Sequence, residues 1–335
     1  MNFMEKSSCD VFLNLMPSIS ERGDLRSTYI VNFAFNTFLS YTAITLNILT
    51  IHAIRKTLAL PKPVKTVLFS LAVSDLGVGL IVQPFYSTLL VFWLQRRKPG
   101  CISYQFFFAA VSLFAISSFF GVVAVSVERF LAINLHLRYQ QVVTHKRVAA
   151  VVIALWILSG FLTLLTVWFP HDSSVIVITV GTVCLFITTA IYIRIYLVFR
   201  RHRIQIQQAL QVQRSASRDM ANFANLRKSA VGVFYVYVVF MVCYLPRAVN
   251  LFIIVITSNP STVMKGFSFF AWTLMLLNSS VNPVIYCLKM RHIRHAIMEI
   301  LRNMSRPMHY QSQARHPQGH IYSTHFTRAE CTSGL

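Results

Sequence analysis

The sequence predicts an all-α membrane protein, a bundle of seven transmembrane helices followed by a short amphipathic cytoplasmic helix. Of its 335 residues, 55% are hydrophobic and 12% are charged, whereas about a quarter of the residues in a soluble domain are charged. The apolar residues fall in long blocks, and a helix that crosses a bilayer needs about 20 mostly apolar residues. None of the blocks shows the alternation of a barrel strand, so each is expected to be a helix. The blocks cover residues 29–53, 64–93, 102–135, 148–169, 175–199, 230–257 and 263–288.

The distribution of basic residues predicts the orientation of these helices. The chain carries 31 Lys and Arg and a net charge of +21, and most of the basic residues fall on one side of the membrane when the helices are threaded in turn. The positive-inside rule makes that side cytoplasmic, which places the N-terminus outside and the C-terminus inside a multi-pass plasma-membrane protein. The same bias accounts for the charge without a nucleic-acid partner and favours contact with anionic membrane lipid.

Four segments are expected along the chain. They are a polar extracellular segment at 1–28, the helical bundle at 29–288, an amphipathic helix at 289–304 and a polar, disordered cytoplasmic tail at 305–335. The terminal "SGL" fits a motif that adds as a strand to a PDZ domain, although a three-residue match also arises by chance. Cys9 and Cys101 both fall on the oxidising side, where they either pair as a disulfide or remain free, since spacing does not decide between these.

Polar side chains inside the apolar blocks are the first candidates for function. Asp75 is the deepest, and a carboxylate within a bundle must be neutralised by a proton, a cation or hydrogen-bond donors. Oxygen- and amide-bearing side chains occur in other blocks and suit a small hard cation such as Na⁺, or a hydrogen-bonded packing cluster. These side chains are Asn47, Ser118, Asn278, Ser279 and Asn282.

Two further features of the blocks indicate a protein that changes conformation. Pro246 in "CYLPR" and Pro283 in "NSSVNPVIY" each remove a backbone hydrogen bond from a helix, so they predict either hinges or simple kinks. Near its end, the third block carries Glu128 and Arg129 side by side, a charged pair that is costly at the edge of an apolar segment.

These features, taken in order, resemble the rhodopsin-like (class A) G protein-coupled receptors. The resemblance extends from about residue 29 to residue 304, and no single motif would suffice to carry it. The matching motifs are Asn47, "LAVSD" ending at Asp75, "ERF" beginning at Glu128, Trp156, Tyr192, "CYLP" ending at Pro246, and "NPVIY" ending at Tyr286.

The resemblance implies a role for each group of residues. Asp75, Ser118, Asn278, Ser279 and Asn282 would form an allosteric sodium pocket that favours the inactive state. Glu128 would hold Arg129 until activation, when Arg129 turns toward a heterotrimeric G protein that also contacts Leu137. Tyr192 and Tyr286 would stabilise the open form, and Tyr244 and Pro246 would act as switches in the sixth helix. Arrestin is a further implied partner.

The departures from the family pattern are informative. Tyr244 stands where the family usually has Trp, and the foot of the sixth helix reads Leu226-Arg227-Lys228, without the acid that would hold Arg129 from that side. Basal activity is therefore expected to be high. The fifth helix lacks its usual proline, and the loop before it, "PHDSS", has no cysteine for the usual disulfide. This pattern resembles the branch of melanocortin, adenosine and cannabinoid receptors, and its melanocortin members most.

The expected ligand pocket lacks an acid that would bind a cationic ligand. Val111 stands where amine receptors have an Asp, and the acidic positions of melanocortin receptors are aromatic here. The one charge in the pocket is Arg247, which predicts either pairing with a small acidic or lipid-like ligand or extension of the side chain toward outer water. The neighbouring candidates for ligand contact are Gln83, Gln105, Asn250 and Trp272.

The sequence leaves three functions open. The leading hypothesis is a receptor that transmits an extracellular ligand signal to a G protein. The alternatives are a constitutively active or scaffolding receptor and a membrane transporter, which would need a polar path across the membrane or an internal repeat. The sequence contains no catalytic constellation, so an enzyme is not expected, and no cofactor is expected beyond the sodium ion.

Overall fold

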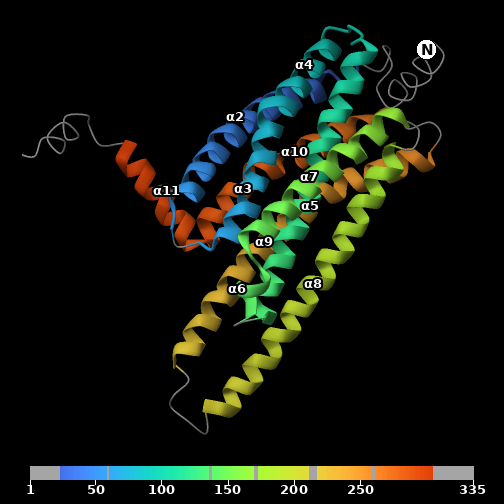
Figure 1. Ribbon diagram of the computed structural model, residues 1–335. Helices are drawn as coiled ribbons and strands as arrows, with labels where there is room; N and C mark the ends of the chain where they lie inside the picture. The colour runs from blue at the N-terminus through green and yellow to red at the C-terminus, as the bar shows by residue number, and fades with distance from the viewer. Residues whose placement is uncertain are drawn as a thin grey trace, which may run out of the picture. The chain divides into compact units, whose positions relative to one another are not determined.

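The computed structural model of the chain describes residues 23–58, 60–135, 138–169, 173–210, 217–257 and 261–304, and every regular element among them is a helix. Figure 1 shows the helices from α2 to α10 lying alongside one another in one bundle. The described helices are α2 (Arg26–Lys56), α3 (Lys62–Gly77), η1 (Val78–Val82), α4 (Gln83–Leu94), α5 (Cys101–Leu135), α6 (Tyr139–Val142), α7 (His145–Trp168), α8 (Ser173–Leu210), α9 (Ser217–Ile256), α10 (Thr262–Lys289) and α11 (Arg291–Met304).

The bundle helices match the apolar blocks of the sequence. Within the described part of the chain, six helical stretches are long and apolar enough to cross a membrane, and they correspond to the first six blocks. The seventh block forms α10, whose 28 residues are less apolar because it contains Asn278, Ser279, Ser280 and Asn282. The fold is therefore the predicted all-α bundle, with its most polar helix last.

Polar caps and prolines account for where several helices begin and bend. Thr144 accepts a hydrogen bond from the backbone N–H of Arg147 and so caps the start of α7, and Ser261 does the same for α10. Pro246 lies inside α9 and Pro283 inside α10. Because proline cannot donate the helical hydrogen bond, both helices have a weakened point at the proline.

The second span is divided by a π-helical turn. The stretch η1, from Val78 to Val82, joins α3 to α4, and Pro84 sits in the first turn of α4. The ring of Pro84 cannot donate to the preceding turn, which favours a wider turn at this point. Gly77, directly before η1, lets α3 approach α5, since a Cβ there would lie 2.2 Å from a ring carbon of Phe114.

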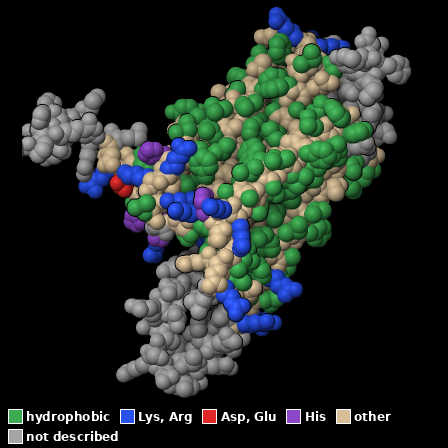
Figure 2. Space-filling model, viewed as in Figure 1, with side chains coloured by type: hydrophobic (Ala, Val, Ile, Leu, Met, Phe, Trp, Pro, Cys, Tyr) green, Lys and Arg blue, Asp and Glu red, His purple; other side chains and the backbone are tan. Residues whose placement is uncertain are grey.

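α7 shows how the bundle is adapted to lipid. Its buried residues are Ser159, Thr163 and Thr166, whereas Ile157 and Phe161 are exposed. The Ser159 hydroxyl donates to a carbonyl of its own helix, which satisfies it without a partner on another helix. Figure 2 shows hydrophobic side chains over most of the visible helical surface and Lys and Arg near the ends. An apolar exterior over a partly polar interior is the arrangement expected in a bilayer.

The described chain divides into two compact units, Met1–Ile297 and Met298–Leu335. The predicted amphipathic helix is α11, whose residues up to Ile297 belong to the first unit. In that part, Ile293 and Ile297 are buried and Arg291 is exposed, so apolar and basic residues occupy different faces. The predicted N-terminal segment up to residue 22 and the tail from 305 lie outside the described residues.

Candidate functional site

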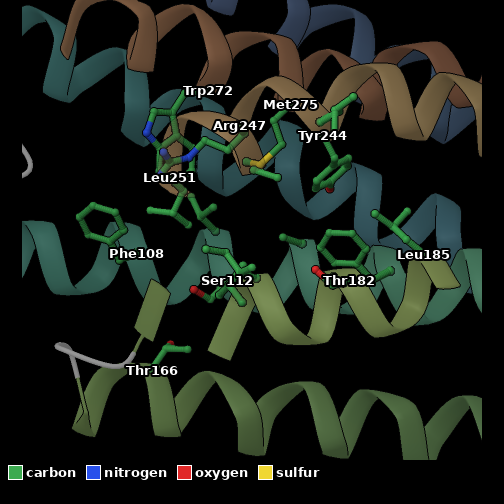
Figure 3. A pocket seen from close by; sticks show the side chains of 18 of the residues that line it. Phe108, Ser112, Thr166, Thr182, Leu185, Tyr244, Arg247, Leu251, Trp272 and Met275 are labelled. Atoms are coloured by element: carbon green, nitrogen blue, oxygen red, sulfur yellow. The ribbon is translucent and has the colours of Figure 1, made fainter. Parts of the chain in front are cut away.

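We call the two ends of the bundle the Arg247 end and the Glu128 end. The Arg247 end contains a cavity of about 120 Å³ enclosed by α5, α7, α8, α9 and α10. Of the residues predicted to contact a ligand, Gln105, Val111, Arg247 and Trp272 line this cavity. Figure 3 shows Arg247 and Trp272 side by side on one wall, with Tyr244 farther along the same side.

Arg247 is held on the cavity wall by two neighbours. Its guanidinium carbon lies 4.2 Å from the ring centroid of Trp272, a cation–π contact. Its Nη1 donates to the Asn250 side chain over 3.1 Å. The Asn250 amide is itself fixed, because its oxygen accepts from Ser268 and its nitrogen donates to the carbonyl of Met264. These contacts point the guanidinium along the wall and hold it in the cavity.

Gln83 and Asn250 do not line the cavity. Asn250 supports Arg247 from behind, and Gln83 is fully buried between α4 and α2, where its backbone carbonyl accepts from Asn36 over 2.7 Å. The Gln83 side-chain amide has no hydrogen-bond partner among the described atoms. Both residues therefore lie behind the cavity surface, Asn250 next to Arg247 and Gln83 away from it.

The charge of the cavity is uncompensated. Its lining includes no Asp or Glu, and no described carboxylate lies within 4.0 Å of the Arg247 guanidinium. The rest of the lining is largely apolar, with Phe108, Leu251 and Met275 among its members. A cation in a mostly apolar, partly desolvated cavity attracts a carboxylate or phosphate more strongly than the same cation in water.

The floor of the cavity is aromatic. Tyr244 and Phe119 line it, with ring centroids 4.9 Å apart. Tyr244 also stacks on Phe240 at 4.2 Å. Pro246 follows two residues after Tyr244 on α9, so the aromatic contacts lie next to the point where that helix lacks a backbone hydrogen bond.

Asp75 lies below this floor and is completely buried. Its Oδ2 accepts from the Asn282 amide over 2.9 Å, and Ser279 lies beside the same carboxylate. Tyr244 and Ser118 are neighbours, and Asp75 acts on Tyr244 electrostatically. The predicted sodium-pocket residues of α3, α5 and α10 are thus brought together, and Asn278 is buried on the same helix as Asn282.

The residues around Asp75 fit a small hard cation. Four buried side-chain oxygens have no partner among the described atoms, one on each of Asp75, Asn47, Asn278 and Asn282. A carboxylate and amide oxygens are the ligand types that a small hard cation prefers. Orphaned buried acceptors are costly, and a cation or waters would satisfy them. The donor set is therefore chemically suited to sodium.

Glu128 has two partners at the Glu128 end. Its Oε2 pairs with the Arg129 guanidinium at 2.5 Å, and its Oε1 accepts from the hydroxyl of Tyr139 on α6. Burial and the neighbouring Glu128 carboxylate raise the pKa of the Tyr139 phenol, so it keeps its proton and remains a donor. Tyr139 was missed in the sequence, where the only signal is a phenol in the short segment after α5.

A second cluster joins three helices near Arg129. Ser126 of α5 lies within hydrogen-bonding distance of the Tyr192 hydroxyl of α8, at 3.3 Å. Tyr192 stacks on Tyr237 of α9 at 5.2 Å. The Tyr237 hydroxyl and Thr189 of α8 are 2.6 Å apart, and because Thr189 donates to the carbonyl of Leu185, Tyr237 is the donor. Sequence reasoning identified Tyr192 and missed Tyr237, whose partner lies 48 residues away.

Some of the remaining predicted site residues lie in the described part of the chain and others lie outside it. Tyr286 is buried on α10, and its hydroxyl has no partner among the described atoms. Leu137 lies outside the described residues, as do the side chains of residues 226–228. Cys101 is disulfide-bonded, but Cys9 lies outside the described residues, so their pairing stays a prediction.

Comparison with known proteins places this bundle in a family. The sequence matches the family described as 7 transmembrane receptor (rhodopsin family) over residues 46–175 and 168–286. It is 26% identical to melanocortin receptor 5 of Mus musculus over 324 residues, which cover 89% of this chain and 95% of the relative. It is 29% identical to adenosine receptor A2b of Homo sapiens over 292 residues, which cover 76% of this chain and 85% of the relative. The predicted resemblance is confirmed, and the chain belongs to the rhodopsin family of seven-transmembrane receptors.

Proposed function

We propose that the protein is a ligand-activated receptor of the plasma membrane that signals to a heterotrimeric G protein. The Arg247 end faces outside, as the distribution of basic residues favours. The observation that carries the proposal is a pair of aromatic clusters that share α9. At the cavity floor, Tyr244 and Phe240 of α9 contact each other and Phe119. In the cluster near Arg129, Tyr237 of the same helix contacts Tyr192.

The two clusters support signalling because both contain residues of one helix, α9. Tyr244, Phe240 and Tyr237 follow one another on α9, which has its weakened point at Pro246. A ligand that displaces Tyr244 would shift the position of α9 and thereby the contact of Tyr237 with α8. Packed interfaces of this kind switch between discrete arrangements, which is how a small shift at a ligand site becomes a large one elsewhere.

The ligand is a small molecule with an acidic head and an apolar body. Arg247 supplies the charge for a carboxylate or phosphate, and the cavity lining otherwise offers mainly apolar contact. The absence of a carboxylate from the lining disfavours a cationic amine or peptide. A lipid-like acid meets both requirements.

A constitutively active or scaffolding receptor is the second candidate. Tyr244, where the family has Trp, favours it. So does the sequence Leu226-Arg227-Lys228 on α9, which has no acid at the positions where the family has one for the arginine that Arg129 matches. Ligand-free messenger production by the wild type and by Arg129→Ala tests this candidate. High output that Arg129→Ala abolishes would favour constitutive activity, and equal output from both would argue against it. Membership of a receptor family leaves the transporter alternative without support.

The decisive experiment is a G protein activation panel, run without ligand and then with acidic metabolites, lipids and peptides. For an acidic agonist found in this way, Arg247→Ala should raise the half-maximal concentration about tenfold to a hundredfold, because a charge-assisted hydrogen bond contributes about 1.5–3 kcal/mol. Arg247→Lys keeps the charge and should retain part of the response.

The control for this experiment is Lys98→Gln, which removes an exposed basic residue after α4 and should leave the response unchanged. A response to the acidic agonist that is the same in the wild type and Arg247→Ala would reject the pairing. No activation of any G protein, with or without ligands, would reject the proposed function itself.

A further inference from the structure

A second cavity, of about 340 Å³, lies at the Glu128 end between α5 and α7. Its size falls in the range of about 300–1,000 Å³ typical of small-molecule sites. The walls are formed almost entirely by aliphatic side chains, among them Val123, Val127 and Val152. The two charged residues on the lining are Glu128 and Arg147. The interior offers almost no polar group to a hydrated ligand, whereas a hydrocarbon chain can pack against its aliphatic walls.

The cavity opens on the surface of the bundle that lipid covers. Val151 lines it and is 54% exposed, and Val142 lines it and is 44% exposed. Because these two side chains belong both to the cavity and to the apolar exterior, a chain can enter from the bilayer without crossing water. Moving a methylene from water into such a cavity lowers the free energy of binding, because apolar surface leaves water. A methylene that enters from lipid was not in water, so only better packing in the cavity favours its binding. Selectivity must therefore come from the polar residues.

Arg147 supplies that selectivity. Its Nη1 donates to the backbone carbonyls of Gln141 at 3.4 Å and Val142 at 3.0 Å. No described carboxylate lies within 4.0 Å of it, and the side chain is exposed, so most of the five guanidinium donors remain available. Glu128, the other charged residue of the lining, is already engaged by Arg129 and Tyr139. The free charge at this cavity is therefore positive.

Neighbouring residues extend the positive charge. Lys146, beside Arg147, is exposed, and His145 lies 3.1 Å from Thr66 at the start of α3. That contact brings the start of α3, with the exposed Lys62, next to the start of α7. Basic residues at the edge of a lipid-facing apolar surface attract anionic headgroups.

We propose that this cavity binds an acyl chain of an anionic phospholipid whose headgroup pairs with Arg147.

The proposal is tested by native mass spectrometry of the purified, delipidated receptor titrated with phosphatidylserine and with phosphatidylcholine of the same acyl chains. Wild type should retain phosphatidylserine more tightly. Arg147→Gln should weaken that retention about fivefold, the contribution of one basic residue near an anionic surface. Val151→Trp fills the cavity from its exposed side and should reduce retention of both lipids. Lys98→Gln, at the other end of the bundle, should behave as the wild type.

A photoreactive phosphatidylserine locates the site. Crosslinked peptides should come from α5 and α7 around Val127 and Val151. Equal retention of the two lipids, equal behaviour of Arg147→Gln and Lys98→Gln, or crosslinks confined to other helices would each overturn the proposal. Competition by water-soluble glycerophosphoserine as strong as by the whole lipid would also overturn it, since the chain would then be unnecessary. None of these readouts depends on signalling, so they are independent of the proposed receptor function.

Discussion

Glu128 is the residue that pairs with Arg129, and in the proposed function it restrains Arg129 before activation. It accepts hydrogen bonds from Arg129 and Tyr139 with its two oxygens, and both partners are on elements that pack against each other. A buried carboxylate with one oxygen unpaired is more costly than one with both paired. Tyr139 therefore stabilises the pair through its hydrogen bond to Glu128.

At the scale of single residues, we expect Tyr139→Phe to raise ligand-free signalling. The substitution removes a donor to a charged acceptor, worth about 1.5 kcal/mol, which shifts a two-state ratio about tenfold. Binding of a non-hydrolysable GTP analogue to the co-expressed G protein, without ligand, measures the effect. Tyr196→Phe makes the same change on an exposed side chain of α8 and serves as the control. Equal ligand-free binding in Tyr139→Phe and the wild type would show that the hydrogen bond does not restrain Arg129.

At the scale of elements, α8 and α9 are fastened by side chains near Arg129. Tyr237 donates to Thr189 across the two helices and stacks on Tyr192. No acid stands at residues 226–228 of α9. The described side-chain contacts that oppose separation of the two helices near Arg129 are this hydrogen bond and the ring contacts of Tyr192 with Tyr237 and Phe234. The contact between Tyr237 and Thr189 would thus do the work that an ion pair between Arg129 and an acid on α9 would otherwise do.

Thr189→Val should loosen this contact while keeping the shape of the side chain. The lost hydrogen bond contributes about 1 kcal/mol, so the separated arrangement should become about fivefold more populated. Distances between spin labels on α8 and α9, measured by double electron–electron resonance, report that population. Thr179→Val, on an exposed position of the same helix, is the matched control. Indistinguishable distance distributions in Thr189→Val and Thr179→Val would contradict the assignment.

At the scale of the whole molecule, polar residues are buried inside a bundle whose exterior is largely apolar. Asp75 and the asparagines of α10 are buried at its middle with acceptor oxygens unpaired. If sodium satisfies them, replacing choline chloride with sodium chloride at constant ionic strength should lower ligand-free signalling by the wild type. Asp75→Asn removes the charge and should abolish that dependence.

Ser70→Ala is the control for Asp75→Asn, because Ser70 bonds to Trp156 on α7 and lies outside the Asp75 cluster. It should preserve the sodium dependence. A sodium effect of the same size in Asp75→Asn would place the ion elsewhere or exclude it.

The sequence was sufficient for the spans and for much of the site. The apolar blocks predicted the bundle because lipid leaves few alternatives to a helix, and the motif spacing brought Asp75 and Asn282 together correctly. It could not show that Gln83 faces away from the cavity, since the π-helical turn just before it alters which face each residue presents. Nor could it pair Tyr237 with Thr189, because contacts between distant segments depend on how helices rotate about their axes.

The π-helical turn η1 also has a consequence for how this span is compared with others. A π turn accommodates more residues than an α turn for a given advance along the axis, and each residue of an α-helix contributes about 100° of rotation. Val78–Val82 therefore behaves as an insertion into the middle of the second span. Removing one residue there would let α3 and α4 continue as a single α-helix and would turn Tyr86, Leu89 and Trp93 away from their present partners. Evolutionary gain or loss of one residue at this point could thus redesign the Arg247 end while leaving Asp75, on the other side of the turn, in place.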